Sequence, residues 1–182
     1  LATSACGSLK KDIKPGDIVI PDQFVNFTRR EDTFYDGPET VHVSSHEPYC
    51  SELRKIIFDA AATNGLPAHP KGTVVVIQGP RFSSQAESHF FRKLGFDIVN
   101  MTQYPEVMLA RELEMCYASV CIVTDYDTGM QDSDVMPVTV ESFLKVFQQN
   151  VDKIKKLMID ITPKIPEERK CICKNALENA KL

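Results

Sequence analysis

The sequence lacks the motifs that bind common nucleotide cofactors and metal ions. It contains neither the GxxxxGK[ST] pattern of a phosphate-binding loop nor the GxGxxG pattern of a dinucleotide fold. The polar segments that follow its predicted strands also lack His and Cys residues at the spacing of a metal site. We therefore expect no metal ion and no cofactor in the site that these segments form.

The chain also has little excess charge and no long apolar run. It carries 21 basic and 25 acidic residues, and the basic ones are scattered apart from short clusters such as Lys155-Lys156. This pattern argues against a nucleic-acid partner. No apolar run approaches the roughly 20 residues of a membrane span. Six Cys residues without a regular framework suit a reducing compartment, so we expect a cytoplasmic protein, also nuclear if eukaryotic.

The beginning of the chain, LATSACGSL, has neither Met nor a charged signal region. It has the pattern of a strand end that runs into a Gly turn. We therefore expect residues 1–182 to form one domain that lacks its N-terminal part. A length of 182 residues and a hydrophobic content of 43% suffice for a single sizeable core.

Apolar runs and helical patterns alternate along the chain. β-branched or apolar runs predict strands at 17–21, 73–78, 96–101 and 118–124, whereas residues 26–41 predict a long loop. Ser51 is predicted to cap a first helix that stops at Gly65, and Ser84 with Glu87 predicts a capping box for a second helix. Further helices are expected near 106–113 and from Thr139 onward. This alternation predicts an α/β fold with a mixed, largely parallel β-sheet flanked by helices.

The last predicted helix carries an apolar stripe at spacings of three and four residues. This spacing predicts one long amphipathic helix. Its members are Val140, Phe143, Phe147, Val151, Ile154, Met158 and Ile161.

Four polar segments follow strand ends, where ligands gather in open α/β sheets. They are TSACGSL at the start of the chain, GPRFSSQAE after residue 78, NMTQYPE after residue 99 and TDYDTG after residue 123. All four are rich in hydroxyl, amide or carboxylate groups. In this order, and over residues 1 to about 160, they resemble the 5′-methylthioadenosine phosphorylase branch of the purine nucleoside phosphorylase family.

The resemblance implies an α/β homotrimer whose co-substrate is inorganic phosphate. The implied reaction cleaves 5′-methylthioadenosine to adenine and 5-methylthioribose 1-phosphate, in purine and methionine salvage. Two alternatives stay open: a phosphorylase that prefers adenosine, inosine or guanosine, and a non-catalytic nucleoside-binding relative.

For phosphate and ribose, the resemblance implies that Ser4 and Ala5 offer a hydroxyl and a backbone N–H to phosphate. Thr102 donates its hydroxyl to phosphate, Met101 lies on the ribose face, and Asn100 shapes the turn. Taken alone, Asn100-Met101-Thr102 equally fits a turn with a core Met.

For the base, the resemblance implies that Asp125 is the catalytic residue facing purine N7 and that Asp127 faces the 6-amino group. Phe82 lies on the purine face, and Ser83 takes the base-specificity position. The 6-oxopurine branch places Asn where Asp125 stands. The residues alone also fit two solvated turn carboxylates, a core Phe and a helix-capping Ser.

The remaining expectations concern the neighbouring subunit, the methylthio group and the C-terminal thiols. The resemblance places His42 in the pocket of the neighbouring subunit, with His46 as a competing candidate. It places Val140, Phe143 and Leu144 around the 5′-methylthio group, although an ordinary core stripe also explains them. Cys171 and Cys173 fit a reactive pair, a disulfide like that of some heat-adapted relatives, or two ordinary thiols.

Overall fold

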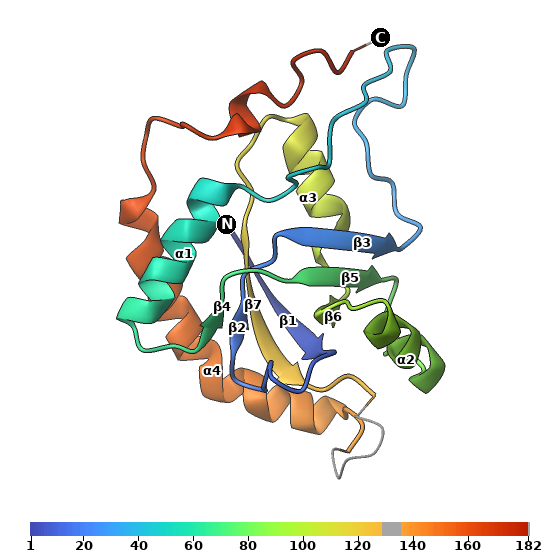
Figure 1. Cartoon of the computed structure of the whole chain (residues 1–182), viewed down its shortest axis with the longest axis vertical. Helices are drawn as coiled ribbons and strands as arrows, with labels where there is room; N and C mark the ends of the chain where they lie inside the picture. The colour runs from blue at the N-terminus through green and yellow to red at the C-terminus, as the bar shows by residue number, and fades with distance from the viewer. Residues whose placement is uncertain (129–135, 182) are drawn as a thin grey trace.

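A computed structural model describes residues 1–128 and 136–181. Its centre is a seven-stranded sheet with the strand order β3-β5-β6-β1-β7-β2-β4, and helices lie on both sides of the sheet (Figure 1). The strands are β1 (Ala2–Ser8), β2 (Ile18–Val19), β3 (Gln23–Phe27), β4 (Ala68–His69), β5 (Thr73–Ile77), β6 (Ile98–Asn100) and β7 (Ser119–Asp125). The helices are α1 (Ser51–Thr63), α2 (Gln85–Lys93), α3 (Gln103–Glu112) and α4 (Val140–Ile161), followed by the short 3₁₀ helices η1 (Thr162–Lys164) and η2 (Ile172–Asn175).

The strand pairings confirm the predicted mixed, largely parallel sheet. Four neighbouring pairs are parallel, β1 with β7, β2 with β4, β3 with β5 and β5 with β6. Two are antiparallel, β1 with β6 and β2 with β7. The central strand β1 therefore has a parallel partner on one side and an antiparallel partner on the other.

Both faces of the sheet are covered, which explains why β5 and the middle of β7 are apolar on both sides. On one face, α1 and α4 pack with β2 and β7 around Ile57, Leu157 and Ile161. On the other face, Tyr104 and Val107 of α3 join a second cluster. Phe91 of α2 joins a third cluster, whose β5 and β6 residues alternate with those of the second and therefore lie on the first face. A strand covered on both sides cannot alternate apolar with polar residues, as β5 illustrates.

The helix caps match the sequence in part. Ser84 accepts the backbone N–H of Glu87 and forms the predicted capping box of α2, while Thr139 caps α4. The residue at the N-cap of α1 is Cys50 rather than Ser51, so the prediction for Ser51 was wrong by one position. α3 begins three residues before the expected start, with a non-helical residue at Tyr104.

The predicted loop at 26–41 contains the end of a strand. β3 runs from Gln23 to Phe27 and pairs in parallel with the whole of β5. The sequence of β3, QFVNF, does not alternate between apolar and polar residues. β3 is an edge strand, and its pairing with β5 stabilises its extended conformation. The chain beyond it is anchored, since the Arg30 guanidinium donates to the carbonyls of Tyr104 at 2.7 Å and Gln78 at 3.0 Å.

The apolar stripe of α4 packs against the core only toward its C-terminal end. Leu157 and Ile161 are fully buried, whereas Val140 is 62% exposed and Phe147 37% exposed. The alternative of an ordinary core stripe therefore does not describe the first half of the helix, which faces the two cavities described below. Within the described residues, no helix has both the length and the apolarity that a membrane crossing requires.

Candidate active site

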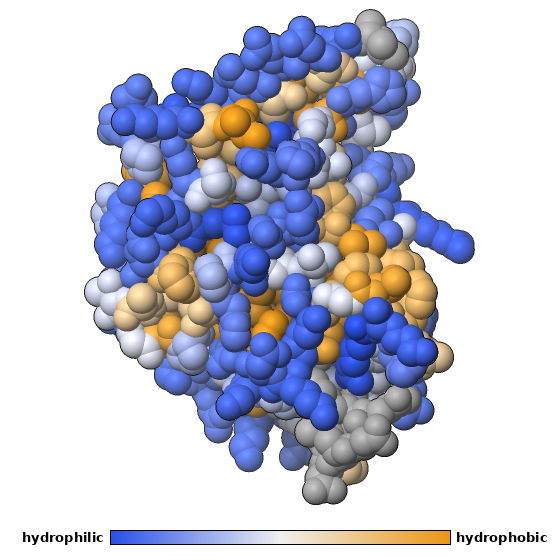
Figure 2. Space-filling model, viewed as in Figure 1, coloured by the Kyte–Doolittle hydropathy of each residue, from blue (hydrophilic) through white to orange (hydrophobic). Residues whose placement is uncertain are grey.

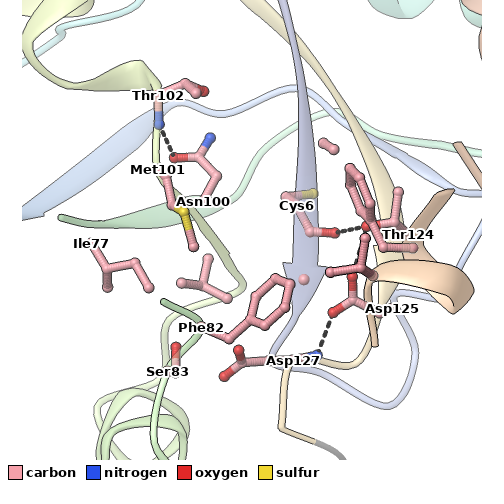
Figure 3. Close-up of a pocket in the computed structure, with 15 residues that line it drawn as sticks. Cys6, Ile77, Phe82, Ser83, Asn100, Met101, Thr102, Thr124, Asp125 and Asp127 are labelled. Carbon is pink, nitrogen blue, oxygen red and sulfur yellow. Dashed lines mark hydrogen bonds between the residues drawn. The ribbon is translucent and has the colours of Figure 1, made fainter. Parts of the chain in front are cut away.

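A cavity of about 310 Å³ lies beside β1, between the ends of β5, β6 and β7 and the start of α4. Figure 3 shows side chains from all four predicted segments turned toward it. It brings together ten of the residues that the sequence singled out. Its lining consists of Ala5, Cys6, Gly7, Ile77, Phe82, Ser83, Val99, Asn100, Met101, Thr102, Thr124, Asp125, Asp127, Val140 and Phe143.

The candidate groups are ordered along β1. Gly7 pairs with Val99 of the antiparallel β6, so the residues that follow β6 run back beside the middle of β1. Gly7 also pairs with Asp125 at the end of the parallel β7. The register therefore places Thr102 toward Ser4 and Asp125 beside Gly7. Thr102 and Asp125 lie on opposite sides of the cavity in Figure 3. Three residues of strand separate Ser4 from Gly7, about 10 Å, which suits a phosphate, a ribose and a base in a row.

This arrangement corrects the argument from strand ends. If all the strands were parallel, the four segments would meet at one shared carboxyl edge of the sheet. β6 instead runs antiparallel to β1, so its carboxyl end lies beside the interior of β1 and not beside the end of that strand. The segments still converge, but along the length of β1.

The Asn100 amide connects the candidate phosphate ligands at one end. Its Nδ2 donates to Ser4 Oγ at 3.2 Å, and its Oδ1 accepts the backbone N–H of Thr102 at 3.4 Å. Ser4, Ala5 and Thr102 also line a second cavity of about 730 Å³ under α4, and Ala5 and Thr102 belong to both. Hydroxyl and backbone N–H groups thus meet where the two cavities adjoin.

Met101 lies across the middle of the cavity, and a glycine makes room for it. Gly79 follows β5 with a φ of +66°, a conformation that favours glycine. A Cβ atom at this position would stand 2.6 Å from Met101 Sδ. Any larger residue would therefore displace the thioether, which the sequence analysis did not foresee.

The Asp125 carboxylate is held in place at the opposite end. The backbone N–H of Asp127 donates to its Oδ1 at 2.7 Å, and the Thr124 hydroxyl lies 2.7 Å from its Oδ2. The same hydroxyl is 3.2 Å from the carbonyl oxygen of Cys6. These contacts fix the carboxyl group against the end of β1.

Burial raises the pKa of Asp125 to about 6. The hydrogen bonds from Thr124 and from the Asp127 backbone stabilise the carboxylate and lower the pKa, and the nearby Asp127 charge raises it. Desolvation outweighs the hydrogen bonds. The expected effect of the second carboxylate is present, but burial is the main cause.

Burial also raises the pKa of Asp127, which adopts a φ of 55° just beyond β7. The hydroxyls of Ser88 and Ser83 and the charge of Arg92 oppose this rise. Ser83 is only 7% exposed and acts on Asp127. It does not cap α2, because Ser84 is the N-cap residue of that helix. Two acidic groups with raised pKa values thus share this end of the cavity.

Apolar side chains form the rest of the walls. Phe82 projects over the space between Met101 and Asp127 in Figure 3, and Val140 and Phe143 contribute the first turn of α4. Leu144 is not among the lining residues and is 42% exposed. The part of the predicted methylthio wall that the structure brings to the cavity is therefore Val140 and Phe143.

His42 lies away from the cavity, on an exposed segment near the C-terminus. Its backbone N–H donates to the carbonyl of Ala180 at 2.8 Å. His46 is exposed too. The structure of one chain therefore brings neither imidazole to the site, and the role of His42 in a neighbouring pocket stays a prediction.

Three positioning residues escaped the sequence analysis. A Cβ atom on Gly7 would lie 2.9 Å from Asp125 Oδ1, so only glycine allows this approach. Gln103 Nε2 lies 3.4 Å from Ser4 Oγ and 3.1 Å from Ser119 Oγ. Thr124 holds the adjacent Asp125, and its hydroxyl also contacts the carbonyl oxygen of Cys6. The contacts with Cys6, Ser4 and Asp125 that involve Thr124, Gln103 and Gly7 join residues distant in sequence, and no local pattern indicates them.

Comparison with known proteins agrees with this geometry. Residues 1–162 match the model of the phosphorylase superfamily. The chain belongs to this family, and the predictions of the fold and of a family of enzymes are confirmed.

Individual relatives divide between two specificities. The chain is 51% identical to S-methyl-5′-thioadenosine phosphorylase of Pyrococcus abyssi, over 98% of this chain and 68% of that protein. It is 48% identical to 6-oxopurine nucleoside phosphorylase of Pyrococcus furiosus, over 99% of this chain and 70% of that protein. Methylthioadenosine phosphorylase of Schistosoma mansoni, solved with adenine, superposes with a TM-score of 0.90 at 34% identity, over 99% of this chain and 71% of that chain. The resemblance to methylthioadenosine phosphorylases is confirmed, and the chain spans about two thirds of these proteins.

Proposed function

We propose that the chain forms the nucleoside site of an enzyme that cleaves 5′-methylthioadenosine with inorganic phosphate. The products are adenine and 5-methylthioribose 1-phosphate. The observation that carries the proposal is the order of groups along β1, with hydroxyls at Ser4 and Thr102, a thioether at Met101 and a carboxyl group at Asp125.

In the reaction, the bond between the anomeric carbon and purine N9 breaks, and its electron pair leaves with the purine. A phosphate oxygen forms the new bond to the anomeric carbon. Binding both reactants beside β1 removes part of the entropic barrier, up to about 7–11 kcal/mol in well-oriented systems. Phosphate near Ser4 and Thr102 also stabilises the cationic character of the ribose, an effect that grows toward the transition state.

Asp125 is the group that assists departure of the base. A protonated Asp125 donates a hydrogen bond, and then its proton, to N7 as negative charge develops on the purine. A pKa of about 6 keeps a fraction of the group protonated near neutral pH and makes it a stronger acid than an alcohol. Met101 meets the ribose with an uncharged, polarisable surface that does not compete for phosphate.

The two carboxyl groups match the outer edge of adenine. That edge offers an acceptor at N7 and a donor at the 6-amino group. One proton shared by Asp125 and Asp127 supplies one donor and one acceptor. A 6-oxopurine offers two acceptors, at N7 and O6, so it needs two donors and fits this pair poorly.

We assign the preference for a 5′-methylthio group over a 5′-hydroxyl group to the apolar wall formed by Val140 and Phe143. Val140 and Phe143 line the cavity and give a methylthio group a dry surface. A ribose 5′-hydroxyl buried there would lose its hydrogen bonds to water.

The alternative is a phosphorylase for ordinary nucleosides, favoured by 48% identity to a 6-oxopurine enzyme. Initial rates on 5′-methylthioadenosine, adenosine and inosine, with and without phosphate, separate the possibilities. We expect methylthioadenosine to be the best substrate and phosphate to be required. A preference for inosine would disprove the assignment of the base edge. Binding without turnover would indicate the non-catalytic alternative.

Assembly as a homotrimer is part of the proposal. Exposed aromatic side chains from β3 and α2 form an apolar area at the right of the surface view (Figure 2); Phe27 is 46% and Phe90 48% exposed. Contact with another copy would cover such an area, and the exposed His42 would be free to reach a neighbour. Light scattering should give three times the chain mass. A cytoplasmic location stays a prediction that cell fractionation can test.

A further inference from the structure

Four cysteines that do not line the cavity meet at one place in the fold. Cys50 precedes α1, Cys116 precedes β7, and Cys171 and Cys173 belong to the start of η2. Their Sγ atoms all lie within 4.8 Å of one another. Residues far apart in the sequence thus place four sulfur atoms around one point.

We propose that Cys50, Cys116, Cys171 and Cys173 bind one zinc ion as a closed structural site. Zinc takes four thiolates at about 2.3 Å in a tetrahedron, which separates neighbouring sulfurs by about 3.8 Å. The sulfurs of Cys116 and Cys171 are 3.4 Å apart, and no pair in the group exceeds 4.8 Å. Small side-chain rotations bring such a set to tetrahedral geometry.

The surroundings favour a bound cation with thiolate ligands. Cys50, Cys171 and Cys173 are 1%, 7% and 3% exposed, so an ion held by them is sealed from water. Metal binding displaces the thiol protons, so the four sulfurs would hold the ion as thiolates.

Positive charge nearby offsets the excess negative charge of a zinc ion with four thiolates. The Arg111 Nη1 lies 3.8 Å from Cys173 Sγ, while its Nε donates to the carbonyl of Ser44 at 3.0 Å. Lys170 and Lys174 flank the Cys171-Ile172-Cys173 segment in the sequence. An N–H donor beside a ligand sulfur is a typical outer partner of a metal site.

The ion would fasten the C-terminal segment to the core. Around it, this segment is held by exposed hydrogen bonds, including Lys170 N–H to Glu52 at 3.0 Å and Arg169 to the Glu114 carbonyl at 2.7 Å. Exposed polar contacts contribute little stability. All four ligand positions are filled by sulfur, so the ion has a structural role and leaves no place for substrate.

The test measures metal in the full protein, purified under reducing conditions from zinc-supplied cells and dialysed against metal-free buffer. Elemental mass spectrometry should find about one zinc ion per chain. Cys171→Ser and Cys116→Ser should each lose at least ten-fold in zinc content. Cys121→Ser is the matched control, because Cys121 is a buried thiol outside the cluster and should leave the zinc content unchanged.

A second measurement needs no variant and covers the case in which a Ser variant fails to fold. In the native protein, a zinc chelator should expose four thiols to a thiol reagent and lower the melting temperature, and added zinc should reverse both effects. Absence of zinc, iron in its place, thiols that react without a chelator, or two disulfides found by peptide mapping would each overturn the proposal. None of these measurements depends on phosphorylase activity.

Discussion

The backbone N–H of Asp127 donates to Asp125 Oδ1 at 2.7 Å, and both carboxyl groups line one cavity. This contact holds the Asp127 backbone against the Asp125 side chain, beyond the end of β7. The Asp127 carboxyl group itself extends toward Ser83 (Figure 3). The local fold thus brings two acidic groups to one cavity.

Replacing Asp125 by Asn tests this pair. The amide is nearly isosteric but cannot transfer a proton, so we expect kcat/KM for methylthioadenosine to fall about 10²–10⁴-fold. Activity on inosine, relative to adenine nucleosides, should rise, because the amide donates to O6 or N7 without a shared proton. Steady-state kinetics on both substrates measure the change. The exposed Asp152→Asn is the matched control, and equal losses in both variants would contradict the role.

The pH dependence follows from the raised pKa of Asp125. If its protonated form is required, log kcat/KM for methylthioadenosine falls with rising pH above about 6. The same shift affects stability in a defined direction. A raised folded-state pKa stabilises the fold below the unfolded pKa of about 3.9, and this contribution is lost as the pH rises through about 6.

Asp125→Asn should therefore remove a destabilising effect at pH 8. A gain on the order of 2 kcal/mol or less is expected, measured by denaturant unfolding at pH 5 and pH 8. A stability difference between variant and wild type that is the same at both pH values would contradict the assigned shift.

Replacing Gly7 by Ala should disable the site while leaving the fold intact. The new Cβ would stand 2.9 Å from Asp125 Oδ1 and 3.2 Å from the Asp127 Cα, so the carboxyl group must move. Misplacement of this size costs roughly 10²-fold in rate. Gly37→Ala is the matched control, because a Cβ there meets nothing within 4 Å. Normal kcat with Gly7→Ala would show that the contact is unimportant.

Removing the hydroxyls at the other end should act on phosphate. Ser4→Ala or Thr102→Val removes one hydrogen bond to a charged ligand, about 1.5–3 kcal/mol, and should raise the KM for phosphate roughly 10–100-fold. The KM for methylthioadenosine should change much less. The exposed Thr63→Val serves as a control, since its hydroxyl only donates to the Asp59 carbonyl. A change confined to the nucleoside would place phosphate elsewhere.

The apolar wall can be tested with two neighbouring residues of α4. Phe143→Ser should reduce the preference for methylthioadenosine over adenosine, by an amount on the order of 1–3 kcal/mol for one small apolar group. Leu144→Ser should leave this preference nearly unchanged, because Leu144 is exposed and does not line the cavity. The ratio of kcat/KM values gives the answer. The reverse result would restore the original assignment of Leu144.

The sequence alone determined the elements that consist of continuous local patterns. Thr73–Ile77 is β-branched and buried on both faces, and Ser84 with Glu87 fixes the start of α2. In both cases the residues that determine the element lie within the same short segment. They are a run of apolar residues for the strand and a cap within one turn for the helix. The polar segments after the strands also supplied Met101, Thr102, Asp125 and Asp127 as candidates.

Only the tertiary structure decided how these candidates are arranged. The antiparallel pairing of β6 with β1 sets their order along one strand, and no residue in either strand encodes that direction by itself. The close approach of Gly7 to Asp125 and the meeting of Cys50 and Cys116 with Cys171 and Cys173 join segments far apart in the chain. Contacts of this kind depend on the packing of the whole fold, which one segment of sequence does not specify.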